Sequence, residues 1–157
     1  MNPPPLQLGR YQFTDVSIFS QRNAKEEERH LVDTNVLATI HRRTPDNARQ
    51  WVVFVNVELK AKGDATPAYF GKVEAFGFVT VIDTWPEQEI EKLVFVNGGG
   101  MIYAAIREMI CSITSRCVYD SFTIPSHSFI ELFKEWQAAL EASKKQPELI
   151  PQTQTTA

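Results

Sequence analysis

The chain has 157 residues and a formal net charge of -3 at pH 7, and 43% of its residues are hydrophobic. One ordinary globular domain has this size and composition, whereas the weak, mixed charge argues against a nucleic-acid partner. The sequence has neither a signal-peptide pattern at its start nor a run that approaches the roughly 20 apolar residues of a membrane span, so we expect a cytoplasmic protein.

Four consecutive segments have the alternating pattern of a β-strand. Consecutive prolines at 3–5 precede them and predict an extended arm over residues 1–10. The strand segments are residues 11–21, 31–43, 50–62 and 69–83. No helical pattern separates them, and Gly63 and Pro67 favour a turn between the last two, so we predict an antiparallel sheet. The charged run at residues 22–29 is interpreted as a solvated crossover.

The two faces of the predicted sheet differ in composition. In the third strand, Val53, Val55 and Val57 share one side, which is typical of a buried face. Four phenylalanines have the opposite parity, namely Phe54, Phe70, Phe76 and Phe78. A sheet that packs helices on one face turns the other toward water, a partner or a client, so these rings either serve such a contact or cover a loop or subunit contact.

Helical patterns follow the strands. Residues 87–95 begin after a proline and predict a first helix, and the glycines at 98–100 predict its end. A second, amphipathic helix is predicted over residues 101–117 from its apolar spacing. Pro125 disfavours helix in the residue before it, so residues 118–127 are expected to be extended.

The last predicted helix begins at a serine cap, Ser126 or Ser128, and ends near Ser143. Its apolar stripe consists of Phe129, Leu132, Phe133, Trp136 and Leu140. Residues 143–157 are polar and predict a flexible tail that does not order itself.

No motif predicts catalysis. The glycines at 98–100 precede a helix but lack the spacing of a nucleotide-binding loop, and we interpret them as a helix break. Cys111 and Cys117 lie on the body of an amphipathic helix, and no histidine stands at a spacing typical of a metal site or a catalytic pair. We therefore predict no catalytic residue, metal or cofactor, and keep a Cys-His enzyme and a purely structural oligomer as alternatives to a binding protein.

The part of the chain from the amphipathic helix to the last helix resembles the SecB family of protein-export chaperones. The residues that carry this resemblance are Ile106-Arg107-Glu108, Ile110, Ser112, Ser115-Arg116, Pro125, Phe129 and Leu132-Phe133. Upstream, the four strands, the charged crossover and a fourth strand that contains Gly71 and Gly77 agree in order. The resemblance covers about residues 11–141.

The resemblance implies an α+β fold over residues 11–142, in which two helices pack on one face of a four-stranded antiparallel sheet. It implies a homotetramer built as a dimer of dimers. The helix between dimers is expected to present Tyr103, Ile106, Met109, Ile110 and Ile113. The implied function is that of an ATP-independent holdase, which keeps unfolded or precursor polypeptides translocation-competent and passes them to a SecA-type export motor.

Clients of such a holdase would lie in apolar grooves near the crossover, the extended linker and the last helix. The expected groove residues are Phe122, Ile124, Phe129, Phe133 and Trp136. Alternatively, Leu132 and Phe133 simply seat the last helix on its own subunit.

The chain departs from the family at the surface expected to dock the export motor. The family uses acidic residues there, and of these the sequence retains Asp15, whereas Phe19 and Lys72 occupy positions where acids are expected. The alternative function is therefore a SecB-like chaperone dedicated to a single client, such as an antitoxin, and not coupled to the motor.

Overall fold

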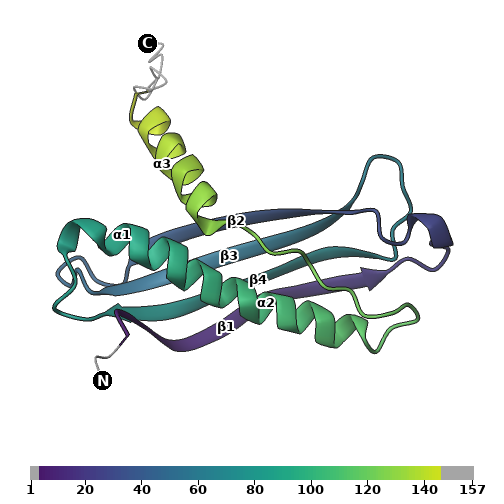
Figure 1. Cartoon of the computed structure of the whole chain (residues 1–157), viewed down its shortest axis with the longest axis horizontal. Coiled ribbons are helices and arrows are strands. Elements are labelled where there is room, and N and C mark those ends of the chain that lie inside the picture. The colour runs from purple at the N-terminus through teal and green to yellow at the C-terminus, as the bar shows by residue number, and fades with distance from the viewer. Residues whose placement is uncertain (1–3, 146–157) are drawn as a thin grey trace, which may run out of the picture.

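Residues 4–145 are described by the computed structural model, and they form a four-stranded sheet with helices on one face (Figure 1). The strands are β1 (Leu6–Ser20), β2 (Val32–Arg42), β3 (Gln50–Ala61) and β4 (Tyr69–Val81). Their order in the sheet is β1-β4-β3-β2, and every neighbouring pair is antiparallel. The predicted antiparallel sheet is confirmed, and β1 and β2 are its edges.

The first strand begins at Leu6 rather than at Tyr11. Pro3, Pro4 and Pro5 have no backbone N–H to donate, and Leu6 is the first residue after them that has one. Leu6 pairs with Val81 and is buried. Residues 6–10 therefore belong to the sheet and not to an extended arm. Two shifts of register interrupt the pairing of β1 with β4, which is typical of an edge strand that twists away from flat pairing.

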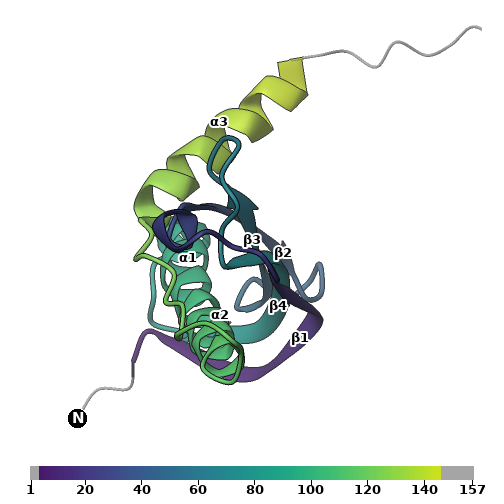
Figure 2. The same ribbon diagram turned by 90° about the vertical axis from the view of Figure 1, so that its right-hand side faces the viewer.

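The helical layer covers one face of the sheet, as the end-on view shows (Figure 2). Its elements are η2 (Glu87–Glu89), α1 (Ile90–Leu93), η3 (Val94–Gly98), α2 (Gly99–Thr114) and the start of α3 (Phe129–Lys145), whereas η1 (Glu26–Glu28) lies in the crossover at one end of the sheet (Figure 1). Taken alone, the stretch Glu87–Thr114 is long and apolar enough to cross a membrane. Half of its most apolar 18-residue segment is, however, buried inside the protein. It serves here as the core helix of a globular fold.

The predicted helix break at the glycines was wrong. The helix continues from α1 into α2 through η3, one π-helical turn. A Cβ on Gly98 would lie 3.0 Å from Val53 Cγ2, and one on Gly99 would lie 2.6 Å from the Phe129 ring. The glycines allow close packing against the sheet and α3, a contact that overrides their low helix propensity.

The core lies between α2 and the sheet. Ile102, Ile106 and Ile110 recur at helical spacing and are fully buried over β3 and β4, together with Val53 and Val57. Burying a side chain of this size contributes about 1.5–3 kcal/mol, so this stripe fixes α2 on the sheet. α3 ends at Lys145, two residues beyond the predicted end at Ser143. The predicted tail beyond Lys145 lies outside the described residues.

Candidate functional site

The segment between α2 and α3, residues 115–128, is called the linker below, and it runs back along α2 (Figure 1). Side chains of α2 hold its backbone. Thr114 Oγ1 accepts a hydrogen bond from the Phe122 amide at 2.8 Å. Tyr103 donates its hydroxyl to the Pro125 carbonyl at 2.6 Å, and Arg107 Nε donates to the Ile124 carbonyl at 3.1 Å. The linker is therefore a fixed part of the fold.

Two tyrosines tie the linker to the strands and the crossover. Tyr69 Oη, from β4, lies 2.9 Å from the Tyr119 carbonyl oxygen. Tyr119 in turn donates its hydroxyl to the Gln21 carbonyl at 2.6 Å, and the Arg29 guanidinium lies 4.7 Å from its ring centroid. Burial raises the pKa of the Tyr69 and Tyr103 hydroxyls, which keeps both protonated as donors.

An aromatic cluster seats the beginning of α3 on the helical layer. The ring centroid of Phe95, from η3, lies 5.4 Å from that of Phe133 and 5.2 Å from that of Trp136. Phe129 packs against Tyr103 at 5.6 Å. Beyond Trp136 the described side chains of α3 are exposed, so the helix is anchored through its first turns and then leaves the body of the protein (Figures 1 and 2).

These contacts change the predicted groove. Ile124 is fully buried, and Phe129 and Phe133 are nearly so. They fill the protomer's own core and leave almost no surface for a client. For Phe133 this burial agrees with the alternative role, in which it seats the last helix on its own subunit. Phe122 and Trp136 are half-buried at the edge of the core, and their outer edges are open.

Sequence reasoning missed Ile130. This side chain is 50% exposed, and it borders two hollows between α1 and α3, of about 360 and 330 Å³. Leu93, Val96 and Trp85 line the second hollow. The predicted apolar stripe of α3 contains Phe129 and Phe133, which the core buries, and does not include Ile130. The exposure of Ile130 depends on the direction in which α3 leaves the core, which the sequence does not show.

The expected interface residues of α2 also divide into two groups. Ile106 and Ile110 pack on the protomer's own sheet, and Tyr103 packs on Phe129 and the linker. All three are buried, so they do not face another subunit. Met109 and Ile113 are half-buried on the flank of the helix.

The open side of α2 carries Met101 and Ala104, both exposed. Tyr11 and Val16, on the helix-bearing face of edge strand β1, are also exposed. These apolar side chains form a second uncovered surface.

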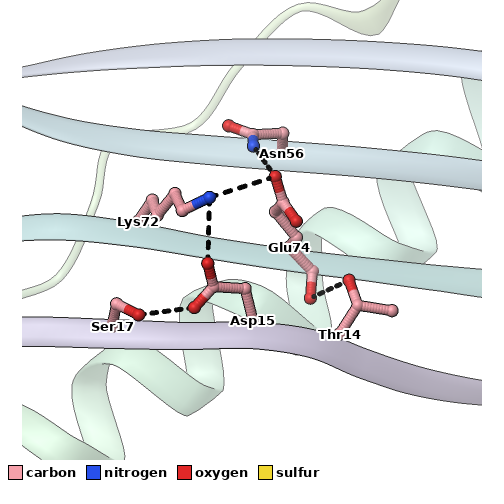
Figure 3. A network of polar contacts seen from close by, with 6 residues as sticks. All are labelled: Thr14, Asp15, Ser17, Asn56, Lys72 and Glu74. Carbon is pink, nitrogen blue, oxygen red and sulfur yellow. Dashed lines mark hydrogen bonds and ion pairs between the residues drawn. The ribbon is translucent and has the colours of Figure 1, made fainter.

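Asp15, the predicted motor-docking acid, lies in a polar network on the outer face of the sheet (Figure 3). Lys72 Nζ lies 2.9 Å from Asp15 Oδ2 and 3.6 Å from Glu74 Oε1, and Asn56 donates to Glu74 at 2.7 Å. The Ser17 hydroxyl and then Lys72 hold the pKa of Asp15 below its ordinary value. The single retained acid is therefore already paired by the lysine that replaces another acid.

The residues considered for chemistry do not come together. No hydrogen bond within residues 4–145 joins a cysteine to a histidine; Cys117 donates to the Ile113 carbonyl instead. His41 packs on Phe54 and His127 on Tyr103. In the described part of the chain, no cluster of three side chains could hold a metal ion.

The fold defined by this sheet, its helical layer and the pinned linker is that of a SecB-like chaperone. Residues 3–140 match the family described as Preprotein translocase subunit SecB. The chain belongs to the SecB family, whose members are chaperones and not enzymes. Among curated proteins, none matches the chain.

Two solved structures are similar to this chain, and the first of them shares its fold. The SecB-like chaperone Rv1957 of Mycobacterium tuberculosis, in complex with a ChAD peptide from the Rv1956 HigA1 antitoxin, is 18% identical with a TM-score of 0.62; the match covers 79% of this chain and 91% of that one. A protein of unknown function from Streptococcus agalactiae is 12% identical, with a TM-score of 0.43 and coverage of 77% and 97%.

Proposed function

We propose that this protein is an ATP-independent holdase of the cytoplasm, which binds unfolded or precursor polypeptides and keeps them competent for export. Family membership supports the chaperone class. The observation that carries the proposal is the exposed Ile130, which borders two hollows between α1 and α3. Trp136 and Phe122 add half-buried apolar side chains elsewhere on the helical layer. These side chains form apolar contacts with an unfolded chain. A folded chain cannot form them, because its own apolar groups are already buried.

Several weak contacts are sufficient for holding. Burying one large apolar side chain contributes about 1.5–3 kcal/mol, which alone gives feeble binding. After the first contact, each further one on the same assembly is intramolecular, and the effective concentration is high. A protein that binds the unfolded state and not the folded state shifts the folding equilibrium by mass action, with no chemical step.

The assembly proposed for this function is a homotetramer. Met101 and Ala104 on the open side of α2, with Met109 on its flank, support a helix-to-helix contact because these small or flexible side chains permit close approach. Tyr11 and Val16 on edge strand β1 support a contact through the strand edge. Together these surfaces are suited to the two contacts that a dimer of dimers requires.

A dedicated chaperone for one client is the second candidate, and one observation favours it. The Lys72–Asp15 pair neutralises the acid that a SecA-type motor would be expected to use. A protein that holds one client, such as an antitoxin, does not need that docking surface. Suppression of aggregation of several unrelated clients would favour the general holdase, and suppression for none of them the dedicated one.

The groove is tested by light scattering while an unfolded client is diluted out of denaturant. Ile130→Gln removes the apolar contact and retains a good helix former, so we expect it to weaken suppression several-fold. Leu140→Gln is the matched control, because Leu140 is an exposed apolar residue of the same helix and borders neither hollow. Equal suppression by the Ile130 variant and the original protein would contradict this groove.

A further inference from the structure

One face of the sheet is covered by no helix of residues 4–145 (Figure 2). Three neighbouring phenylalanine rings lie on this face. The centroids of Phe54 and Phe76 are 5.6 Å apart, and those of Phe76 and Phe78 are 5.5 Å apart. Phe54 is 42% exposed and the other two are half-buried. These three residues are called the outer aromatic row, and they fall at one end of the face, beyond the Asp15–Lys72 network.

Basic side chains border the outer aromatic row. The Arg43 guanidinium carbon lies 5.1 Å from the centroid of Phe78, and the His41 ring lies 5.8 Å from that of Phe54. Arg10 lies beside Gln12, which is the strand partner of Phe76. With the Gln12 amide turned so that its oxygen faces the guanidinium, Arg10 donates to this side-chain oxygen. An arginine that packs flat on a ring keeps its N–H donors free at its edge, where they can receive a carboxylate.

Acidic side chains are scarce at this end of the sheet. The strand residues 6–14, 37–42, 50–56 and 75–81 contain none. Glu74, next along β4, is bonded to Asn56 and Lys72, and Asp46 lies beyond Arg43 in the following turn. Among residues 4–145, neither Arg10 nor Arg43 forms an ion pair. The patch is locally positive on a chain whose net charge is -3.

The row also has a recess for an apolar group. A hollow of about 230 Å³ lies beside Phe54 and is lined by Leu37, which is 59% exposed, and by Thr39 and the Asn56–Glu74 pair. Exposed rings, an adjoining recess and guanidinium groups that form no ion pair within residues 4–145 combine the features of a peptide-binding surface, in which apolar anchors supply binding and charges select the partner.

We propose that the outer aromatic row and its arginines bind an acidic polypeptide segment of a partner protein, one in which carboxylates alternate with apolar side chains. The site lies on the sheet face opposite α3 and the linker, so it does not depend on the proposed client groove. Single-stranded nucleic acid fits less well, because the net charge of the whole chain is -3 and repels a polyanion.

The test measures fluorescence anisotropy with labelled peptides on the whole protein. The probe alternates glutamate with leucine; a second peptide has lysine in place of glutamate, and a third has serine in place of leucine. We expect the glutamate–leucine peptide to bind best. The charge-swap variant Arg10→Glu with Arg43→Glu should bind it about tenfold more weakly and should gain binding of the lysine–leucine peptide.

Matched variants assign the apolar part of the site. Phe54→Thr removes the ring but introduces another residue with high strand propensity, so it should weaken peptide binding. Phe70→Thr, at the opposite end of the same face, should leave peptide binding unchanged. Ile130→Gln should leave this binding unchanged, so a failure here is separable from a failure of the client groove. Circular dichroism and the thermal midpoint verify that each variant is folded.

Several results would overturn the proposal. One is full binding of the glutamate–leucine peptide by the charge-swap variant, and another is an equal loss with Phe70→Thr. Displacement of the peptide by a single-stranded DNA oligonucleotide would assign the surface to nucleic acid. Absence of peptide binding, together with a smaller assembly mass for Phe54→Thr, would show that a second copy of the chain covers the row.

Discussion

At the scale of single residues, Glu28 joins two segments that are far apart in the sequence. Its carboxylate accepts hydrogen bonds from both the amide and the hydroxyl of Thr66 at 2.7 Å, and from Lys25 at 3.0 Å. The crossover is thereby attached to the β3–β4 hairpin. The Thr66 bonds, and then Lys25, lower the pKa of Glu28 from an ordinary value of 4.5 to about 2.

This lowered pKa predicts a pH-dependent stability. The ionised form favours the folded state, so its contribution is full above pH 4.5 and is lost as the pH falls toward 2. Glu28→Gln should lower the urea midpoint at neutral pH, and the gap between variant and original should narrow over that acidic range. Glu27→Gln, at an exposed neighbour, is the control. A gap that stays constant with pH would contradict the role of the carboxylate.

At the scale of elements, the helical stretch from α1 to α2 depends on glycines for contact and not for flexibility. Gly99→Ala would place a Cβ 2.6 Å from the Phe129 ring, whereas a Cβ on Gly100 meets nothing within 4 Å. We expect Gly99→Ala to destabilise the protein by about 1–3 kcal/mol through overpacking. Gly100→Ala should stabilise it by about 0.5–1 kcal/mol, since alanine is the better helix former. Urea unfolding measures both.

Equal effects of the two alanines would mean that α3 does not pack on Gly99 in solution. An increased exchange rate of the α3 amides, in Gly99→Ala alone, would locate the damage at the start of that helix.

The sequence predicted the elements whose signals are local. Strand alternation, the extended linker before Pro125 and the capping serine were all visible; Ser128 is the residue that caps, through the Glu131 amide. The continuous helix through Gly98 was not visible, because its cause is Val53 in a distant strand.

The candidate site was predicted less well for a related reason. The sequence placed the expected groove residues on the linker and α3, but an extended segment shows only which residues are apolar and not which of them the core buries. Ile124 turned inward, and Ile130, outside the predicted stripe, stayed exposed. The pairing of Asp15 with Lys72 was equally out of reach, since it joins neighbouring strands whose register depends on two bulges.

At the scale of the whole molecule, the two edge strands have different consequences for assembly. The proposed self-contact uses β1, where Val16 is exposed on the helix-bearing face of the sheet. Val16→Lys should reduce the mass measured by light scattering after gel filtration, because a charge on an edge strand opposes pairing. Leu37→Lys, an exposed site on the opposite edge strand β2, should leave the mass unchanged. A monomeric original protein would overturn the proposed assembly, and an unchanged mass for Val16→Lys would move the contact elsewhere.

The attachment of the linker to α2 and β4 has a consequence for speed. Tyr103, Arg107 and Tyr69 donate hydrogen bonds to its carbonyls, and Thr114 accepts one from its Phe122 amide, so its backbone is already held in the free protein. For the proposed holdase, capture requires no ordering of its own linker, and the loss of conformational freedom falls on the client alone. A receptor that is ready in this way binds on encounter and is not delayed by its own rearrangement, so the competition is between the rate of encounter and the rate at which the client folds.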